Sequence, residues 1–269
     1  MDLWADFPRN EDLAGLAAYR TGSGPDLVLI HGVGLRSEAW GAMIGPLSQN
    51  FRVWAIDMPG HGESAVQTLV SMDDFAVTFE KAVDAIGAPV AVAGHSMGAM
   101  IALQLAGRQK ISLSHVAALN AIYRRTPAAS HAVRARARAL AVEPNPDPKP
   151  TLERWFGSKP EGAKKSASDA CKRWLESCPS EGYLRAYTVF AEHDGPSNDI
   201  LSAIDVPALF LTGENEPNST PAMSASMSAK VMHGQTAIIR DAAHMAPMTH
   251  GSEISDRLIA FFKSDSGDT

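Results

Sequence analysis

The sequence predicts an α/β fold in which helices cover both faces of a mostly parallel β-sheet. Through the first 120 residues, short continuous apolar runs alternate with segments of helical periodicity. The alternation stops between residues 121 and 199 and returns from residue 200 onward. Such a pattern indicates parallel strands joined by helical crossovers, with one insertion between two of the strands.

Six segments have the composition of buried strands, four of them before the interruption and two after it. The segment from Met72 to Gly87 has apolar residues at helical spacing and a terminal glycine, so it is predicted to form a helix. An amphipathic pattern over residues 252–264 predicts the last helix. The six strand segments are residues 26–31, 52–57, 89–95, 116–120, 206–213 and 236–241.

The interrupted stretch, residues 121–199, is polar and helical in pattern, without a clear strand. We therefore expect a core made of residues 1–120 and 200–269, with residues 121–199 as a helical insertion. Alternating prolines between Glu143 and Pro150 predict an extended connector there, because proline disrupts helix interiors and central strands.

Two groups of side chains in the insertion could shape a binding site. The stretch AVRARARAL contains Arg134, Arg136 and Arg138; on a helix Arg134 and Arg138 share a face, which we expect to be a solvated basic face. The aromatic residues are expected mainly in the core of the insertion, with one or two facing a ligand. They are Trp155, Phe156, Trp174, Tyr183, Tyr187 and Phe190.

The composition is that of a globular protein, with 269 residues, 45% hydrophobic residues and a net charge of −6. The acidic balance argues against a nucleic-acid partner. No stretch is long and apolar enough for a membrane span or a signal peptide, so a cytoplasmic protein is expected. Cys171 and Cys178 lie about two helical turns apart, which predicts free thiols, and no further ligands gather there to form a metal site. The composition leaves the oligomeric state open.

The motif Gly94-His95-Ser96-Met97-Gly98 follows an apolar strand and precedes a helical segment. On a sharp strand-to-helix turn, Ser96 would be held in a strained conformation at the carboxyl edge of the sheet, as a nucleophile requires. The alternative is a serine that only caps the helix. Because the other parts of a catalytic site also occur in the sequence, we favour the nucleophile.

A serine hydroxyl needs a base, and the base needs an orienting acid. His244 follows the strand segment 236–241 on a short loop at the same edge of the sheet, and it is the favoured base. His31 and His95 end strands and are expected to shape the site. The loop after residue 213 offers two acids, Glu214 and Glu216, and the residues alone do not choose between them.

Two glycine-rich loops complete the pattern. In HGVG, residues 31–34, the Val33 N–H is predicted to pair with the Met97 N–H as donors to a developing oxyanion. In DMPGHGES, residues 57–64, Asp57 and His61 are expected to tie a compact turn together rather than to act in catalysis. Neither loop has the spacing of a phosphate-binding motif.

Together these motifs resemble the α/β-hydrolase family, and the resemblance extends from Asp26 to Phe262. It implies an eight-stranded, mostly parallel sheet flanked by helices, with a helical cap inserted after the sixth strand. It also implies a nucleophile–acid–histidine chain order and a cofactor-free reaction. Ser96 and His244 match the nucleophile and the base, and Val33 and Met97 match the oxyanion positions. A serine nucleophile argues against the haloalkane dehalogenase and epoxide hydrolase branches, which use aspartate.

The acid departs from the family pattern, which usually has aspartate at the position of Glu216. Glutamate is a known variant there, and we favour Glu216 over Glu214, which would point the other way on an extended loop. Some family members carry the acid after the preceding strand of the core, where this chain has Asn120 instead.

The resemblance predicts a hydrolase for a small carboxylic ester or lactone, acting through an acyl-enzyme intermediate. The segment GYLRAYTVFAEHD is similar to the corresponding part of bacterial enol-lactonases, and carbon–carbon bond hydrolases that act on β-diketone-like substrates are also similar. A binding protein with a degenerate triad is the third alternative. His31, Arg124 and Arg125 are the candidate substrate contacts, and either arginine could bind a substrate carboxylate.

Overall fold

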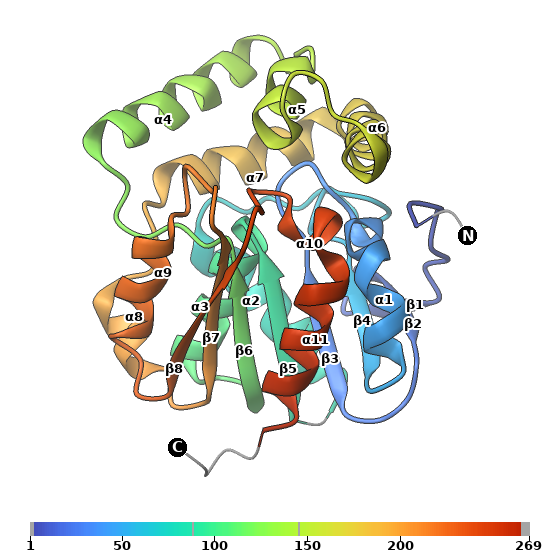
Figure 1. Ribbon diagram of the computed structural model, residues 1–269, viewed down its shortest axis with the longest axis vertical. Helices are drawn as coiled ribbons and strands as arrows, with labels where there is room; N and C mark the ends of the chain where they lie inside the picture. The colour runs from blue at the N-terminus through green and yellow to red at the C-terminus, as the bar shows by residue number, and fades with distance from the viewer. Residues whose placement is uncertain (1–2, 88, 145, 265–269) are drawn as a thin grey trace.

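The computed structural model describes residues 3–87, 89–144 and 146–264. Its centre is an eight-stranded sheet with the strand order β1-β2-β4-β3-β5-β6-β7-β8 (Figure 1). The pairs β1–β2 and β2–β4 are antiparallel, whereas every neighbouring pair from β4 to β8 is parallel. The predicted fold class is therefore confirmed. The strands are β1 Glu11–Leu13, β2 Leu16–Thr21, β3 Asp26–Ile30, β4 Arg52–Ile56, β5 Val90–His95, β6 Leu113–Leu119, β7 Ala208–Gly213 and β8 Gly234–Ile239.

All six predicted strands are present, with bounds that differ by at most three residues from the expected ones. The central strands are continuous apolar runs because both of their faces are covered: every residue of β3, β5 and β7 is buried. The sequence did not predict β1 and β2. β1 has only three residues and forms the edge of the sheet, and β2 beside it has partly exposed residues that weaken the apolar pattern.

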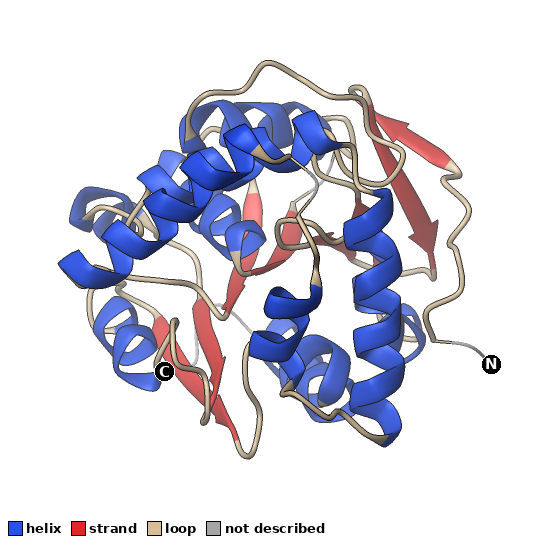
Figure 2. Cartoon of the chain, turned by 90° about the horizontal axis from the view of Figure 1, so that it is seen from above, coloured by secondary structure: helices blue, strands red, loops and turns tan. Residues whose placement is uncertain are grey.

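Helices cover both faces of the sheet (Figures 1 and 2). One face carries α1 and α11, which pack against each other, together with the short helix α10. The other carries α2, α3, α8 and α9, and a separate apolar cluster fills each interface. The predicted helices at residues 72–87 and 252–264 are confirmed as α2 and α11. The bounds are α1 Gly41–Ser48, α2 Met72–Asp84, α3 Met97–Arg108, α8 Asn198–Ala203, α9 Pro221–Ser228, α10 Ala246–Thr249 and α11 Gly251–Phe262, and a 3-10 helix spans Ser37–Trp40.

Four helices lie between β6 and α8, stacked over one edge of the sheet at the top of Figure 1. They are α4 Pro127–Val142, α5 Lys149–Phe156, α6 Gly162–Ser177 and α7 Ser180–Glu192. The insertion follows the sixth strand, as expected, while the exact division into core and cap stays a prediction.

The proline-rich connector is shorter than predicted. Lys149 and Pro150 begin α5 instead of continuing the connector. Proline is tolerated in the first turn because its missing N–H would have no helical acceptor there. Cys171 and Cys178 are free thiols, as expected. Within the described ranges, no helix has both the length and the apolar character that crossing a bilayer requires.

Candidate active site

Ser96 lies between β5 and α3 with the backbone angles φ 56° and ψ −117°, a conformation that L-residues rarely adopt. The sharp turn depends on close backbone approaches at both glycines of the motif. A Cβ on Gly94 would lie 2.0 Å from the Gly98 carbonyl oxygen, and one on Gly98 would lie 2.1 Å from the Ile30 carbonyl oxygen. The predicted elbow is confirmed. The Ser96 side chain makes no capping hydrogen bond to α3, so the helix-cap alternative is not supported.

The loop after β3 passes directly beside this serine. A Cβ built on Gly32 would lie 3.1 Å from Ser96 Cβ, so the backbone of the loop touches the nucleophile candidate. Among the described residues, neither the Val33 N–H nor the Met97 N–H has a hydrogen-bond acceptor. Both amides of the predicted oxyanion pair are thus available to a ligand at this point.

Two buried histidines hold the loop in place. His31 Nδ1 donates to the Gly32 carbonyl and its Nε2 accepts from the Met58 N–H, at 2.8 and 2.9 Å. His61 Nε2 accepts from the Gly34 N–H at 3.0 Å. Burial lowers the pKa of both rings, to about 3 for His61, so they are neutral. His31 is fully buried with both nitrogens bound to backbone, which replaces its predicted substrate contact with a structural role.

His244 follows β8 and is bound to Glu216. The distance between His244 Nδ1 and Glu216 Oε2 is 2.7 Å, and the carboxylate is completely buried. This bond holds the Nδ1 side of the imidazole ring at Glu216. The other ring nitrogen, Nε2, has no hydrogen-bond partner among the described residues. Ser96 and His244 are not directly hydrogen-bonded here. Both lie at the carboxyl edge of the sheet because Ser96 follows β5 and His244 follows β8, and His95 Nε2 donates to the His244 carbonyl at 2.8 Å.

The Glu216 carboxylate is held from several sides. Oε1 accepts from the backbone N–H groups of Asn218 and Ser219, and Oε2 also accepts from Asn120 Nδ2 at 3.2 Å. Burial by itself raises the pKa of Glu216, but the charge and hydrogen bond of His244 together with these amides lower it to about 2. Asn120, which takes the position of a family acid, therefore supports the acid instead.

Glu214 lies outside this arrangement. Its side chain is exposed, and its Oε2 accepts from the Asp241 N–H at 3.1 Å. The two glutamates of the loop thus differ in kind, since one is buried against a histidine and the other closes a surface turn.

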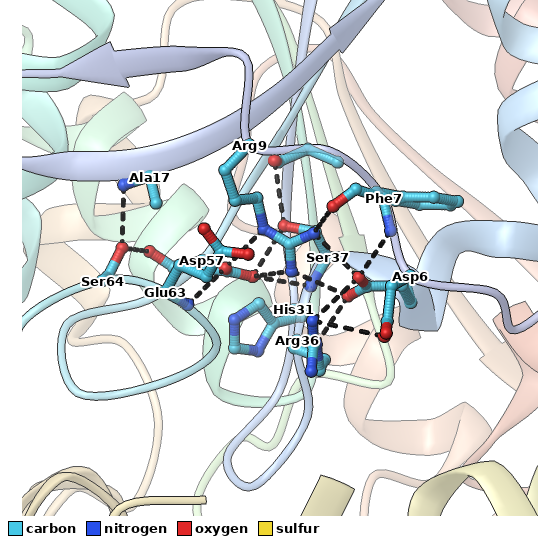
Figure 3. A network of polar contacts seen from close by, with 12 residues as sticks. Asp6, Phe7, Arg9, Ala17, His31, Arg36, Ser37, Asp57, Glu63 and Ser64 are labelled. Carbon is cyan, nitrogen blue, oxygen red and sulfur yellow. Dashed lines mark hydrogen bonds and ion pairs between the residues drawn. The ribbon is translucent and has the colours of Figure 1, made fainter.

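A buried ionic cluster lies behind the loop after β3 (Figure 3). The Arg9 guanidinium, 3% exposed, binds Glu38 and Asp57, whose side chains are completely buried. Asp57 also accepts from the Ser37 N–H, the Ser37 hydroxyl and the Glu63 N–H. The predicted structural role of Asp57 is confirmed. Its partner Arg9, and Glu38, the second carboxylate bound to Arg9, were missed, because no local pattern links residues so far apart.

Two aromatic residues of the insertion face the site. The Trp155 ring stacks on the His244 ring, with a centroid distance of 6.1 Å and an interplanar angle of 27°. Tyr183 packs on the loop after β3: a Cβ on Gly34 would lie 2.8 Å from Tyr183 Cε2. Phe156 and Trp174 are buried in an apolar cluster that joins the insertion to core residues such as Trp4 and Met248, rather than in a core of the insertion alone.

Neither predicted arginine contact reaches this site. The Arg125 guanidinium binds the Phe190 and His193 carbonyls and Asp194, so its donors are used inside the insertion. Arg124 is exposed, stacks over Tyr123 and lines a cavity of about 490 Å³ whose lining includes neither Ser96 nor His244. In the part of the chain that the structure describes, no three His, Cys, Asp or Glu side chains group as metal ligands would.

Comparison with known proteins agrees with this geometry. Residues 27–257 match the model of the alpha/beta hydrolase family. The (E)-2-((N-methylformamido)methylene)succinate hydrolase of Acinetobacter baylyi is 37% identical over 248 residues, which cover 91% of this chain and 93% of that protein. A pimeloyl-[acyl-carrier protein] methyl ester esterase of Stenotrophomonas maltophilia is 28% identical over 250 residues, covering 90% and 94%.

Solved structures are similar over nearly the whole chain. A thermophilic esterase from Thermogutta terrifontis, in a structure with malate bound, is 26% identical with a TM-score of 0.80 and covers 92% of this chain and 93% of its own. The enol-lactonase from Burkholderia xenovorans, 21% identical, has a TM-score of 0.80 and covers 93% and 96%; it shows the fold alone. The chain belongs to the alpha/beta hydrolase family and is a hydrolase of that fold.

Proposed function

We propose that the protein is a serine hydrolase with the catalytic residues Ser96, His244 and Glu216. The observation that carries the proposal is the 2.7 Å bond between His244 Nδ1 and the buried Glu216 carboxylate, beside a strained serine. A carboxylate on Nδ1 sets the tautomer that leaves Nε2 as an acceptor for the serine proton. Glu216 rather than Glu214 takes this role because only Glu216 contacts the ring.

In the proposed reaction, Ser96 Oγ attacks a carbonyl carbon while His244 Nε2 removes its proton. The Val33 and Met97 N–H groups stabilise the oxyanion, and Glu216 stabilises the imidazolium. The imidazolium then protonates the leaving group, and an acyl-enzyme remains. Water, deprotonated by His244, attacks the acyl group and releases the acid.

The substrate class proposed first is a small carboxylic ester or lactone, the class expected from the sequence. A second candidate is the amide bond of an N-acyl enamine, because the relative with 37% identity over 91% of this chain is named as a hydrolase of (E)-2-((N-methylformamido)methylene)succinate. Both reactions are acyl transfers to water and use the same serine, histidine and oxyanion donors.

A fluorophosphonate probe tests the nucleophile directly. Wild-type protein is expected to be labelled on Ser96, as located by peptide mass spectrometry, while Ser96→Ala is not labelled and Ser202→Ala, at an exposed serine of α8, is labelled normally. A folded wild-type protein without label at Ser96 would refute the proposal. A panel of esters, lactones, N-acyl enamines and β-diketones then separates acyl transfer from carbon–carbon cleavage.

A further inference from the structure

Arg136 is turned inward, unlike its neighbours on α4. Its Nη2 donates to Thr151 Oγ1 at 2.6 Å, and its guanidinium lies 5.4 Å from the centre of the Tyr187 ring. The Nε atom is buried and has no hydrogen-bond partner in the described part of the chain. Arg134, two residues away, instead pairs with acidic residues at the surface. Arg136, which does not share the helix face of Arg134 and Arg138, therefore has a different environment from theirs.

Arg154 lies on α5 directly before Trp155, the residue that stacks on His244. Among the described residues it has no hydrogen bond and no ion pair. Arg154 is an exposed residue, and partial burial of its guanidinium together with the nearby charge of Arg136 lowers its pKa. Tyr187, Tyr183 and Glu216 complete the charged and titratable groups that act on it.

Arg136 binds Thr151, which lies three positions before Arg154 on α5 and so shares a helix face with it. Neither arginine has an ion-pair partner among the described residues. Glu216 acts on Arg154 electrostatically, but its oxygens are engaged by His244, Asn120 and backbone amides. Two like charges repel each other more strongly where they are partly shielded from water, and a buried hydrogen-bond donor without an acceptor costs free energy. Stacking on Tyr187 offsets part of this free-energy cost for Arg136, but no aromatic ring stacks on Arg154 among the described residues. An anion between the two side chains would satisfy both.

The position of Arg136 and Arg154 relative to Ser96 and His244 indicates which molecule would supply the anion. Trp155 anchors α5 over His244, and Tyr183 anchors α7 over the loop that carries Val33. We infer that Arg136 and Arg154 bind a carboxylate group of the substrate, whose scissile carbonyl lies at Ser96. The substrate class is then a small anionic acyl compound, and a planar guanidinium fork suits a carboxylate. The inference rests on the proposed function for the place of the reacting bond.

A matched pair of esters tests the charge preference. p-Nitrophenyl hemisuccinate and p-nitrophenyl butyrate have acyl chains of equal length, and the former ends in a carboxylate. The ratio of their kcat/KM values is expected to fall roughly 10- to 100-fold in Arg154→Gln and in Arg136→Gln, the loss of one charge-assisted hydrogen bond. Arg138→Gln, which removes an exposed charge from the same helix, is expected to keep the wild-type ratio. Equal ratios in wild type and both variants would overturn the inference.

Binding of succinate separates this inference from the proposed chemistry. Calorimetry on Ser96→Ala protein needs no turnover, and Arg154→Gln added to it is expected to weaken succinate binding at least about tenfold. Undiminished affinity, or no binding to Ser96→Ala at all, would overturn the carboxylate site. If wild type hydrolyses neither ester but succinate binding depends on Arg154, the ester reaction fails while the carboxylate site stands. Because Arg136 packs on Tyr187, its variant is also checked by thermal unfolding.

Discussion

Arg9 of the core differs from Arg136 and Arg154 of the insertion in the partners of its guanidinium group. Arg9 is buried between two carboxylates, with every partner supplied by the chain itself (Figure 3). Arg136 and Arg154 are partly desolvated without an acid partner among the described residues. A polar group whose partners are all internal builds structure, whereas one that lacks them is available to a ligand.

The histidines also differ in whether their ring nitrogens have partners within the chain. His31, His61 and His95 are buried, hydrogen-bonded to backbone and kept neutral by burial, so they shape the site without exchanging protons. His244 has one nitrogen fixed by a carboxylate and the other available. The contrast between satisfied and available groups leads to four predictions.

The largest effect is expected from Glu216→Gln, which removes the buried carboxylate bound to His244 in the proposed triad. The amide can no longer fix the tautomer or stabilise the imidazolium, so kcat should fall by roughly four orders of magnitude, as in other serine triads. Glu214→Gln, on the same loop, should change kcat less than about threefold, because its side chain closes a surface turn. Steady-state kinetics on any substrate of the panel measures both values of kcat. A large loss in Glu214→Gln with a small loss in Glu216→Gln would assign the catalytic acid to Glu214.

Arg9→Met should cost about 3–5 kcal/mol of unfolding free energy, because it leaves the Glu38 and Asp57 carboxylates buried without their cation. The control is Arg257→Met, which breaks an exposed pair with Glu253 on α11 and should cost no more than about 0.5 kcal/mol. Urea denaturation measures both. Similar losses in the two variants would contradict the structural role given to the cluster.

Low pH should lower the unfolding free energy of the protein, because the paired carboxylates of the core become protonated. Burial alone raises the pKa of Asp57 and Glu38, but hydrogen bonds from Arg9 outweigh it, and the pKa of Glu216 falls to about 2. Because these folded-state values lie below those of the unfolded chain, their stabilisation is present above about pH 4.5 and is lost as the pH falls toward 2. Unfolding free energies at pH 7, 5, 4 and 3 should show this loss, with a shallower slope in Glu216→Gln. Parallel slopes would rule out the Glu216 contribution.

The smallest effect on stability is expected from Arg154→Gln. Its guanidinium has no hydrogen bond or ion pair within the described chain, so the unfolding free energy should change by less than about 0.5 kcal/mol. The same variant is expected to lose carboxylate selectivity, which sets it apart from Arg9. A loss of several kcal/mol would mean that Arg154 holds the insertion together.

Much of the fold could be predicted because the sequence patterns that indicate it involve residues close together in the chain. Buried parallel strands read as apolar runs, and the elbow needs two glycines at fixed spacing around Ser96. The edge strand β1 and its neighbour β2 escaped prediction because they have too few buried residues to produce a pattern. Pro150 was misplaced because proline breaks helix interiors but fits a first turn.

By itself, the sequence determined the order of the six parallel strands from β3 to β8, the serine elbow, the histidine after the last strand and a loop with two candidate acids. Only the tertiary structure decided which glutamate meets His244, that Asn120 supports it, and that Arg125 is consumed inside the insertion while Arg136 and Arg154 are not. The reason is physical. Backbone conformation depends on neighbours in the chain, whereas the pairing and burial of long side chains depend on residues up to about a hundred positions away, which only folding brings together.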